Sequence, residues 1–541
     1  MRSSEPRALA ALHSPSVLVM VMLTLFIISS PARSQPPKGV PTGPCPALVA
    51  ADLSALLDAP TEVRSAELVE RVRDVPAHCR VRGYVMPNVG FTILLPASGW
   101  NHKFLEVGCG GYCGDVYIEQ CMDAVRTGYT CIASDMGHSS TYYDGKWAYN
   151  NLQAKVDFGY RATHVTALAG KAITERFYAQ PPEKAYYMGC STGGRQGMVE
   201  AQRFPWDFDG IIAGSVNIGM EDELMELLWD SLQIRGSDGQ YILNKKDLQL
   251  IHDAAVTKCD MDDNVKDGII GNPRACQFDP AELLCTGERP TACLSARQID
   301  AVRNIYAGPM TSKGVRISTG GPMPGSELSW IDWLLPSETS QAISPNDSMT
   351  EIFTREWFRY LAFVPDPGPA WKPTDFDFDR EYKRFMNLES LYSDSNPDLR
   401  KFKQAGGKLI VWGGWNDPDA TPRGIIDYYE TAEKTMGGRQ ATQDFFRLFL
   451  VPGMSHCGMG EGPFAIDYLH YLEEWVEKGE SPDVLIGRES IRHLFAQKSE
   501  IKPAPSAAKH TRPVYPFPAW TRYKGAGNPN DAASYEPVEL H

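Results

Sequence analysis

The stretch from Tyr186 to Arg195 reads YYMGCSTGGR, an apolar run that breaks into small residues around Ser191. Residues 189–193, GCSTG, match the pattern G-x-S-x-G, in which small neighbours let a strand turn sharply into a helix and expose the serine hydroxyl. AYYM before the pattern predicts the strand, and RQGMVEAQRF after it predicts a helix whose first N–H groups attract negative charge. A plain tight turn also matches the bare pattern, so it is the predicted strand and helix that favour a nucleophilic Ser191.

Short strand-like runs alternate with helical stretches on both sides of this turn. Such alternation is typical of an α/β fold with a mainly parallel sheet and helices on both faces. The expected strands cover residues 91–95, 103–107, 129–134, 185–188, 408–412 and 445–451, and the expected helices cover residues 152–178, 423–434 and 465–478.

The alternation stops between residues 217 and 398, where prolines and glycines cluster and acidic residues crowd positions 260–267. We interpret residues 217–398 as an inserted domain, and residues 35–216 and 399–541 as the two parts of a catalytic domain. The last segment, AGNPNDAASYEPVELH, shows no packing pattern of its own.

Charge and the N-terminus limit the partners and the compartment. A net charge of -14 disfavours nucleic acid and anionic membranes as partners. Arg2 and Arg7 precede an apolar run, Val17 to Ile28, and small residues then lead to Ser34. This pattern predicts a signal peptide over residues 1–34. The alternative is a membrane anchor, but that run falls short of the roughly 20 residues that span a bilayer. We expect a secreted or periplasmic protein that is free of the membrane after cleavage, with no protein partner implied.

A nucleophilic serine needs a base held by a third group. In folds with this turn the acid and the histidine follow the serine along the chain, each just past a strand. Asp417 follows KLIVWGGWN and His456 follows FFRLFLVPGMS, so we predict these two as the partners of Ser191, with Asp419 as the reserve acid. The other histidines, among them His138, His164 and His470, are expected to be surface or core residues.

Cysteines flank both ends of this arrangement, because Cys190 precedes Ser191 and Cys457 follows His456. All 12 cysteines follow the predicted cleavage site, and an even number in an exported chain favours disulfides over free thiols. A Cys190–Cys457 bridge would hold the serine turn against the histidine loop. Two unrelated buried thiols are the alternative.

An acyl-transfer site also needs N–H donors for the oxyanion, one of them from the residue after the serine. We assign that donor to Thr192 and the second to Gly110 in the loop GCGGYCG, with Gly111 in reserve. A tight turn without a catalytic role is the alternative. A dinucleotide site is disfavoured, because the loop lacks the G-x-G-x-x-G helix start.

The acidic loop CDMDDNVKDGI, which begins at Cys259, carries oxygen donors at a density that suits a calcium ion. An EF-hand fails, because Val265 replaces the glycine at its sixth position and Gly271 replaces the glutamate at its twelfth. The residues alone fit a solvated acidic loop equally well.

Together, Cys190-Ser191, Asp417 and His456-Cys457 resemble the paired-cysteine Ser-Asp-His motif of the tannase/feruloyl esterase family. The resemblance covers nearly the whole mature chain, through GCGGYCG, SDMGH, DFGYRATH, GWNDPDATP and RYKGAGNPNDAAS. It implies an α/β-hydrolase core, a large inserted lid over the active site, and hydrolysis of esters of hydroxylated aromatic acids such as ferulate or gallate. Bacterial hydrolases of mono(2-hydroxyethyl) terephthalate are similar relatives.

The resemblance also implies a calcium ion in the lid. Carried over residue by residue, its ligands are Asp260, Asp263, Asp267 and the main-chain oxygens of Val265 and Ile269. The implied disulfides are Cys259–Cys276, Cys285–Cys293 and Cys45–Cys79.

The chain departs from the family pattern in its cysteines. Family members often carry a C-terminal cysteine pair, where this chain has Val514 and Pro537 nearby. Conversely, four cysteines crowd the predicted oxyanion loop, and their three possible connectivities stay open: Cys109, Cys113, Cys121 and Cys131.

We therefore expect a secreted serine esterase that cleaves feruloyl or galloyl esters through an acyl-enzyme. The first alternative is an aromatic monoester hydrolase of the mono(2-hydroxyethyl) terephthalate type, which needs a cation such as Arg359 for the free carboxylate. The second is a non-catalytic calcium-dependent binding protein on a hydrolase scaffold, which the triad in chain order disfavours.

Overall fold

The computed structural model describes residues 39–216, 218–286, 292–488 and 510–539. The predicted signal peptide, residues 1–34, lies outside these ranges, so its prediction stands as made. Within the ranges, no helix combines the length and the apolar character that crossing a membrane requires.

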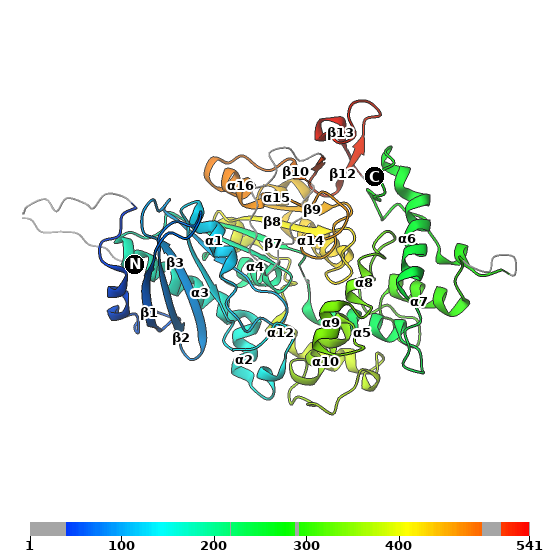
Figure 1. Cartoon of the computed structure of the whole chain (residues 1–541), viewed down its shortest axis with the longest axis horizontal. Helices are drawn as coiled ribbons and strands as arrows, with labels where there is room; N and C mark the ends of the chain where they lie inside the picture. Colours follow the sequence, from blue (N-terminus) through cyan, green and yellow to red (C-terminus); the bar gives the residue numbers. More distant parts are fainter. Residues whose placement is uncertain (1–38, 217, 287–291, 489–509, 540–541) are drawn as a thin grey trace, which may run out of the picture. The chain divides into compact units, whose positions relative to one another are not determined.

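The described residues form one main sheet of nine strands in the order β1-β2-β3-β5-β4-β6-β7-β8-β9 (Figure 1). The six strands from β5 to β9 in that order are parallel, and β1, β2 and β3 add an antiparallel edge. The predicted mainly parallel sheet is confirmed. The strands are β1 Thr61–Val69, β2 His78–Val85, β3 Val89–Pro96, β4 Lys103–Val107, β5 Thr130–Ser134, β6 Lys184–Cys190, β7 Gly210–Gly214, β8 Lys408–Gly414 and β9 Phe446–Val451.

Helices cover both faces of this sheet. Successive side chains of a strand point to opposite faces, so neighbouring residues of β4 show which helices lie on each face. Phe104 of β4 packs in an apolar cluster with residues of α3, α4 and α14. Its neighbour Leu105 packs in a second cluster with residues of α1 and α16. The helices are α1 Glu119–Arg126, α2 Leu152–Val156, α3 Ala162–Tyr178, α4 Thr192–Arg203, α14 Pro422–Met436, α15 Arg439–Gln443 and α16 Tyr468–Glu473.

The segment between β7 and β8 adds no strand to the main sheet within the described residues. It has an apolar cluster of its own, which runs from Ile234 to Leu335. The domain limits 217–398 remain a prediction. The helices between β7 and β8 are α5 Met220–Ile234, α6 Lys245–Cys259, α7 Ala296–Ala307, α8 Trp330–Trp333, α9 Glu338–Ile343, α10 Met349–Tyr360, α11 Glu381–Phe385, α12 Glu389–Tyr392 and α13 Arg400–Gln404.

The C-terminal segment differs from the expectation that it has no packing pattern. Its strand β13, Tyr535–Glu539, pairs antiparallel with β12, Ala519–Tyr523, and Tyr535 is buried. A further small sheet joins β10, Leu485–Arg488, to β11, Thr511–Val514. The segment is ordered by these partner strands, whose pairing a local pattern of residues does not reveal.

Candidate active site

Ser191 lies in the predicted turn between β6 and α4, in a backbone conformation with φ 62° and ψ −127° that side-chain-bearing residues rarely adopt. Its N–H donates to the carbonyl of Gly214 at the end of β7, at 3.0 Å. A Cβ at Gly189 would lie 2.5 Å from the carbonyl of Gly193, so the strand and the helix can approach this closely only at glycine. The strained turn therefore sets Ser191 at the N-terminus of α4.

Asp417 and His456 meet beside this turn. Asp417 follows β8 and His456 follows β9, and His456 Nδ1 lies 3.0 Å from Asp417 Oδ2 and 3.2 Å from Oδ1. The buried carboxylate of Asp417 also accepts the N–H groups of Asp419 and Ala420, at 3.0 Å each. These bonds fix the position of the Asp417 carboxyl against the imidazole. Within the described part of the chain, no hydrogen bond joins Ser191 Oγ to His456, and such bonds are often long before substrate binds.

A disulfide joins the two loops, as the flanking cysteines predict. Cys190 and Cys457 are bonded at 1.97 Å across 267 residues of sequence. Cys457 has φ 55°, and its N–H donates to Ser215 Oγ at 3.2 Å. The residue before the serine is thus linked covalently to the residue after the histidine.

Asp419, the reserve acid, contacts the opposite side of the imidazole, with its Oδ2 at 3.3 Å from His456 Nε2. Burial alone lowers the pKa of His456, but the charges of Asp417 and Asp419 outweigh it and raise that pKa to about 9. Burial raises the pKa of Asp419 to about 6, although the charge of His456 works in the opposite direction. The two acids therefore favour the protonated form of His456.

Aromatic side chains from the insertion line the approach to His456. The Trp333 ring stands edge-on to the imidazole with centroids 5.0 Å apart, and Phe353 lies 6.3 Å from Trp333. Phe353 in turn packs on Tyr112 and Tyr142 from the loops that follow β4 and β5. The sequence alone did not identify these residues, because the insertion meets the sheet loops only in the folded chain.

A cavity of about 170 Å³ lies beyond Asp419 and contains no triad residue. Its lining is strongly acidic, with Asp222, Glu223, Glu226 and Asp427 in addition to Asp419. Burial raises the pKa of Glu226 to about 8 and that of Asp222 to about 6. Glu226 is therefore largely protonated near pH 7, so the lining is less negative than its composition indicates.

The predicted oxyanion donors lie on the two loops that meet above the sheet. Thr192 is the first residue of α4, and its hydroxyl donates to the carbonyl of Gly111 at 2.7 Å. In the described part of the chain, no acceptor is bonded to the N–H of Thr192 or Gly110. The loop after β4 also packs closely on the serine turn, since a Cβ at Gly193 would lie 3.0 Å from the Cys109 carbonyl. This geometry leaves both N–H groups available to an oxyanion.

The acidic loop that follows α6 gathers the predicted calcium ligands. Asp260 accepts two backbone N–H groups of the loop, and Arg512 forms an ion pair with Asp267. Burial and the charge of Asp267 raise the pKa of Asp263 to about 7. No hydrogen bond from a described residue reaches the carbonyl of Val265 or Ile269. Three carboxylates and two free carbonyls are the donors that calcium prefers, so the loop fits the ion.

The remaining cysteines are also paired, and no cysteine is free. The pairs implied by the family resemblance lie at bonding distance: Cys45–Cys79, Cys259–Cys276 and Cys285–Cys293. The four cysteines around the oxyanion loop, whose pairing the sequence left open, form the disulfides Cys109–Cys113 and Cys121–Cys131.

Comparison with known proteins places this geometry in a family. The family model described as tannase and feruloyl esterase matches residues 73–538. A mono(2-hydroxyethyl) terephthalate hydrolase from Piscinibacter sakaiensis is 32% identical, with 85% of each chain covered. A probable feruloyl esterase B-2 from Aspergillus flavus is 33% identical, over 76% of this chain and 80% of the relative.

A solved structure shares the fold. The crystal structure of feruloyl esterase B from Aspergillus oryzae superimposes with a TM-score of 0.78 at 26% identity, and covers 91% of this chain and all of that one. The sheet and its helices are therefore those of an α/β-hydrolase, as the resemblance implied.

Proposed function

The chain belongs to the tannase and feruloyl esterase family and is a carboxylic ester hydrolase that acts on aromatic esters, and we propose that it cleaves esters of hydroxylated aromatic acids through an acyl-enzyme on Ser191. The observation that supports this most is the convergence of three strand ends. Ser191 follows β6, Asp417 follows β8 and His456 follows β9, and a disulfide joins the first loop to the last.

In the proposed reaction His456 removes the proton of Ser191 as its oxygen attacks the ester carbonyl. Asp417 orients the imidazole through Nδ1 and stabilises its positive charge. The N–H groups of Thr192 and Gly110 bind the oxyanion. His456 then returns the proton to the leaving alcohol, and water releases the acid from Ser191 by the same route.

For His456 to act as the base, its Nε2 has to leave Asp419 and face Ser191. Substrate binding can drive this step, because an ester in the site excludes water and fills the space beside Trp333. The resting contact with Asp419 therefore competes with the catalytic contact, which makes the pH dependence of the enzyme informative.

The aromatic wall of Trp333, Phe353 and Tyr142 supports an aromatic acyl group, since flat rings pack well on such side chains. A terephthalate monoester carries a free carboxylate, for which Arg359 was the expected partner. Arg359 instead donates to the carbonyl of Trp371 and lies 3.9 Å from Glu356. These contacts of Arg359 favour an uncharged acyl group over the terephthalate alternative.

We further propose that the chain is secreted and that a calcium ion stabilises the acidic loop. Six disulfides are consistent with an oxidising, extracellular environment. The ion would be held by Asp260, Asp263, Asp267 and the carbonyls of Val265 and Ile269, and it would supply charge balance to the loop and no step of the ester chemistry.

One panel tests the substrate proposal. The catalytic efficiency, kcat/KM, is measured on methyl ferulate, methyl gallate and mono(2-hydroxyethyl) terephthalate at one pH. We expect at least one of the first two to exceed the terephthalate ester by about tenfold or more, the scale of one well-placed contact. A preference for the terephthalate ester would overturn the proposed substrate class and leave the serine mechanism standing.

A further inference from the structure

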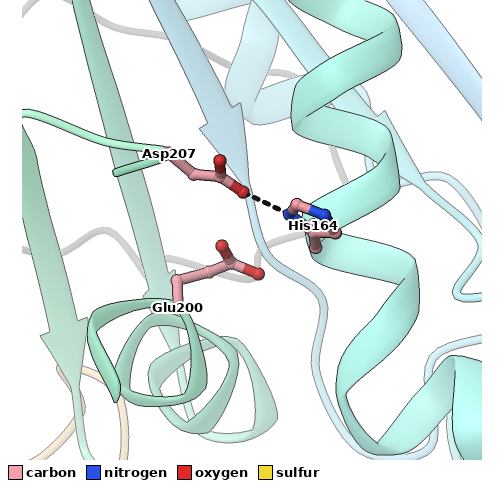
Figure 2. A group of neighbouring side chains, drawn as sticks. All are labelled: His164, Glu200 and Asp207. Atoms are coloured by element: carbon pink, nitrogen blue, oxygen red, sulfur yellow. Dashed lines mark hydrogen bonds and ion pairs between the residues drawn. The ribbon is translucent and has the colours of Figure 1, made fainter. Parts of the chain in front are cut away.

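Three ionisable side chains, His164, Glu200 and Asp207, gather in the core away from the triad (Figure 2). The Nδ1 atom of His164 lies 2.5 Å from Oδ2 of Asp207. Each residue offers a ligand atom within 4.8 Å of those of the other two, which holds for no other group of histidine, cysteine and acidic residues in the described ranges. All three side chains are at least nine-tenths buried.

The three residues come from different elements. His164 lies on α3, Glu200 lies on α4, and Asp207 lies in the loop that leads from α4 to β7. Figure 2 shows the carboxyl of Glu200 pointing toward the other two side chains. Glu200 lies nine residues beyond Ser191, which is roughly 13 Å along the helix. The group is therefore too far from the serine to take part in the ester chemistry.

Glu200 is buried and has another acid as its neighbour. The residue is 0% exposed, no N–H donor of a described residue reaches its side-chain oxygens, and its carboxyl forms a hydrogen bond with that of Asp207. The side chain nearest to it in the group is another carboxyl, Asp207. A buried carboxylate without a donor or a cation is strongly unfavourable. A positive charge between Glu200 and Asp207 would remove this cost.

Another buried acidic side chain lies near this group. Glu106 on β4 is 2% exposed, has an oxygen without a partner, and interacts electrostatically with Asp207. Lys171 is a neighbouring cation that acts on Glu106 and Glu200, and its ammonium group donates to the main-chain carbonyl of Asp207. Three buried acidic side chains and one lysine therefore share this part of the core. A divalent cation would add the positive charge that these acids need in order to ionise together.

We propose that His164, Glu200 and Asp207 bind one Zn²⁺ ion, a site separate from the calcium loop. One imidazole nitrogen and two carboxylates are ligands that zinc accepts in proteins. The ligating nitrogen and oxygens must be unprotonated, so zinc binding weakens as the pH falls. The ion ties α3 and α4 to the loop before β7, and so fixes the helix that begins at the nucleophile.

The test measures zinc binding by the full-length mature protein with calcium in excess, so that the acidic loop is saturated. Protein stripped of zinc is titrated with Zn²⁺ alone, and bound metal is counted after desalting. We expect one equivalent of zinc per chain and a rise in the melting temperature, Tm, of about 2 °C or more. Absence of bound zinc together with an unchanged Tm overturns the proposal, and this result requires no variant.

Two variants locate the ion. Glu200→Gln keeps the shape of the side chain and removes its charge, and we expect it to bind zinc at least tenfold more weakly. The control is Asp263→Asn in the acidic loop, which should bind zinc as the wild type does. Equal zinc affinity in Glu200→Gln, or a loss in Asp263→Asn of the same size, would refute the assignment.

Discussion

Ser191 has a hydroxyl at the end of β6, and its removal tests the proposed nucleophile. We expect Ser191→Ala to lower kcat/KM by at least about 10⁴-fold, because serine hydrolases retain only binding and oxyanion stabilisation without the nucleophile. Labelling by a fluorophosphonate probe should vanish as well. Ser231→Ala, which removes a buried hydroxyl of α5, serves as the control and should keep both activity and labelling. Labelling that persists in Ser191→Ala would place the nucleophile elsewhere.

We predict that Asp419 contributes to the pH at which His456 can act as a base. In the free enzyme the pKa of His456 is about 9, because Asp417 and Asp419 both stabilise its protonated form. The catalytic efficiency should therefore rise with pH until the imidazole loses its proton. Asp419→Asn removes one of the two negative charges, so the protonated form loses stabilisation and the pKa falls. We expect the acidic limb of kcat/KM against pH to move down by about one pH unit.

The control for this profile is Asp222→Asn, which changes a carboxyl of the same acidic cavity that does not act on His456. Its acidic limb should coincide with that of the wild type. If Asp419→Asn shifts the limb upward or leaves it in place, the contact with Nε2 does not govern the base.

At the scale of elements, the Cys190–Cys457 bridge aligns the loop after β6 with the loop after β9. Replacing both cysteines with alanine should lower the free energy of unfolding by about 5 kcal/mol, since the bridge closes a loop of 267 residues. It should also lower kcat/KM by about 100-fold through misalignment of His456 and Ser191. Guanidinium unfolding and kinetics at a temperature where both proteins are folded provide the two measurements.

The matched control is the double alanine variant of Cys285 and Cys293, a bridge that closes a loop of 8 residues within the insertion. This variant should keep full activity. An undiminished kcat/KM in the Cys190 and Cys457 variant would show that the sheet alone aligns the site.

The elements near the site could be predicted because their signals are local. Asp417 and His456 each follow an apolar run that the structure confirms as a strand, so chain order sufficed to select them. The strand β7 was not predicted, because GIIAG is only five residues long and is bounded by glycines. Trp333 and the contact between Asp419 and His456 could not be predicted either, because both depend on how distant loops fold together.

At the scale of the whole molecule, the acidic loop that follows α6 meets the C-terminal segment through Arg512 and Asp267. Loss of the proposed calcium ion should therefore destabilise both the acidic loop and the C-terminal segment. We expect the calcium-selective chelator EGTA to lower the Tm of the wild type by several degrees, since an ion bound only by the folded state stabilises it. Asp263→Asn should start at the lower Tm and show no response to EGTA. An identical Tm with and without chelator in the wild type would refute a structural calcium ion.

The parallel strands in the centre of the sheet could be predicted from the sequence, and most of the antiparallel strands at its edge could not. The alternation of strands and helices fixes the parallel part of the sheet, since buried parallel strands have continuous apolar runs. Of the antiparallel edge β1–β3, only residues 91–95 were predicted as a strand, and they lie within β3. The strands β1 and β2 are interrupted by charged residues, as TEVRSAELV and HCRVRGYV show, because these edge strands are partly open to solvent.

The bridge between Cys190 and Cys457 has a further consequence for a chain exposed to proteases. A single cut after Lys313, in an exposed turn of the insertion, would leave Ser191 on one fragment and Asp417 with His456 on the other. Every other disulfide lies within one of these fragments. The nicked enzyme would stay one covalent molecule with its catalytic groups opposed, and it would separate into two pieces only after reduction.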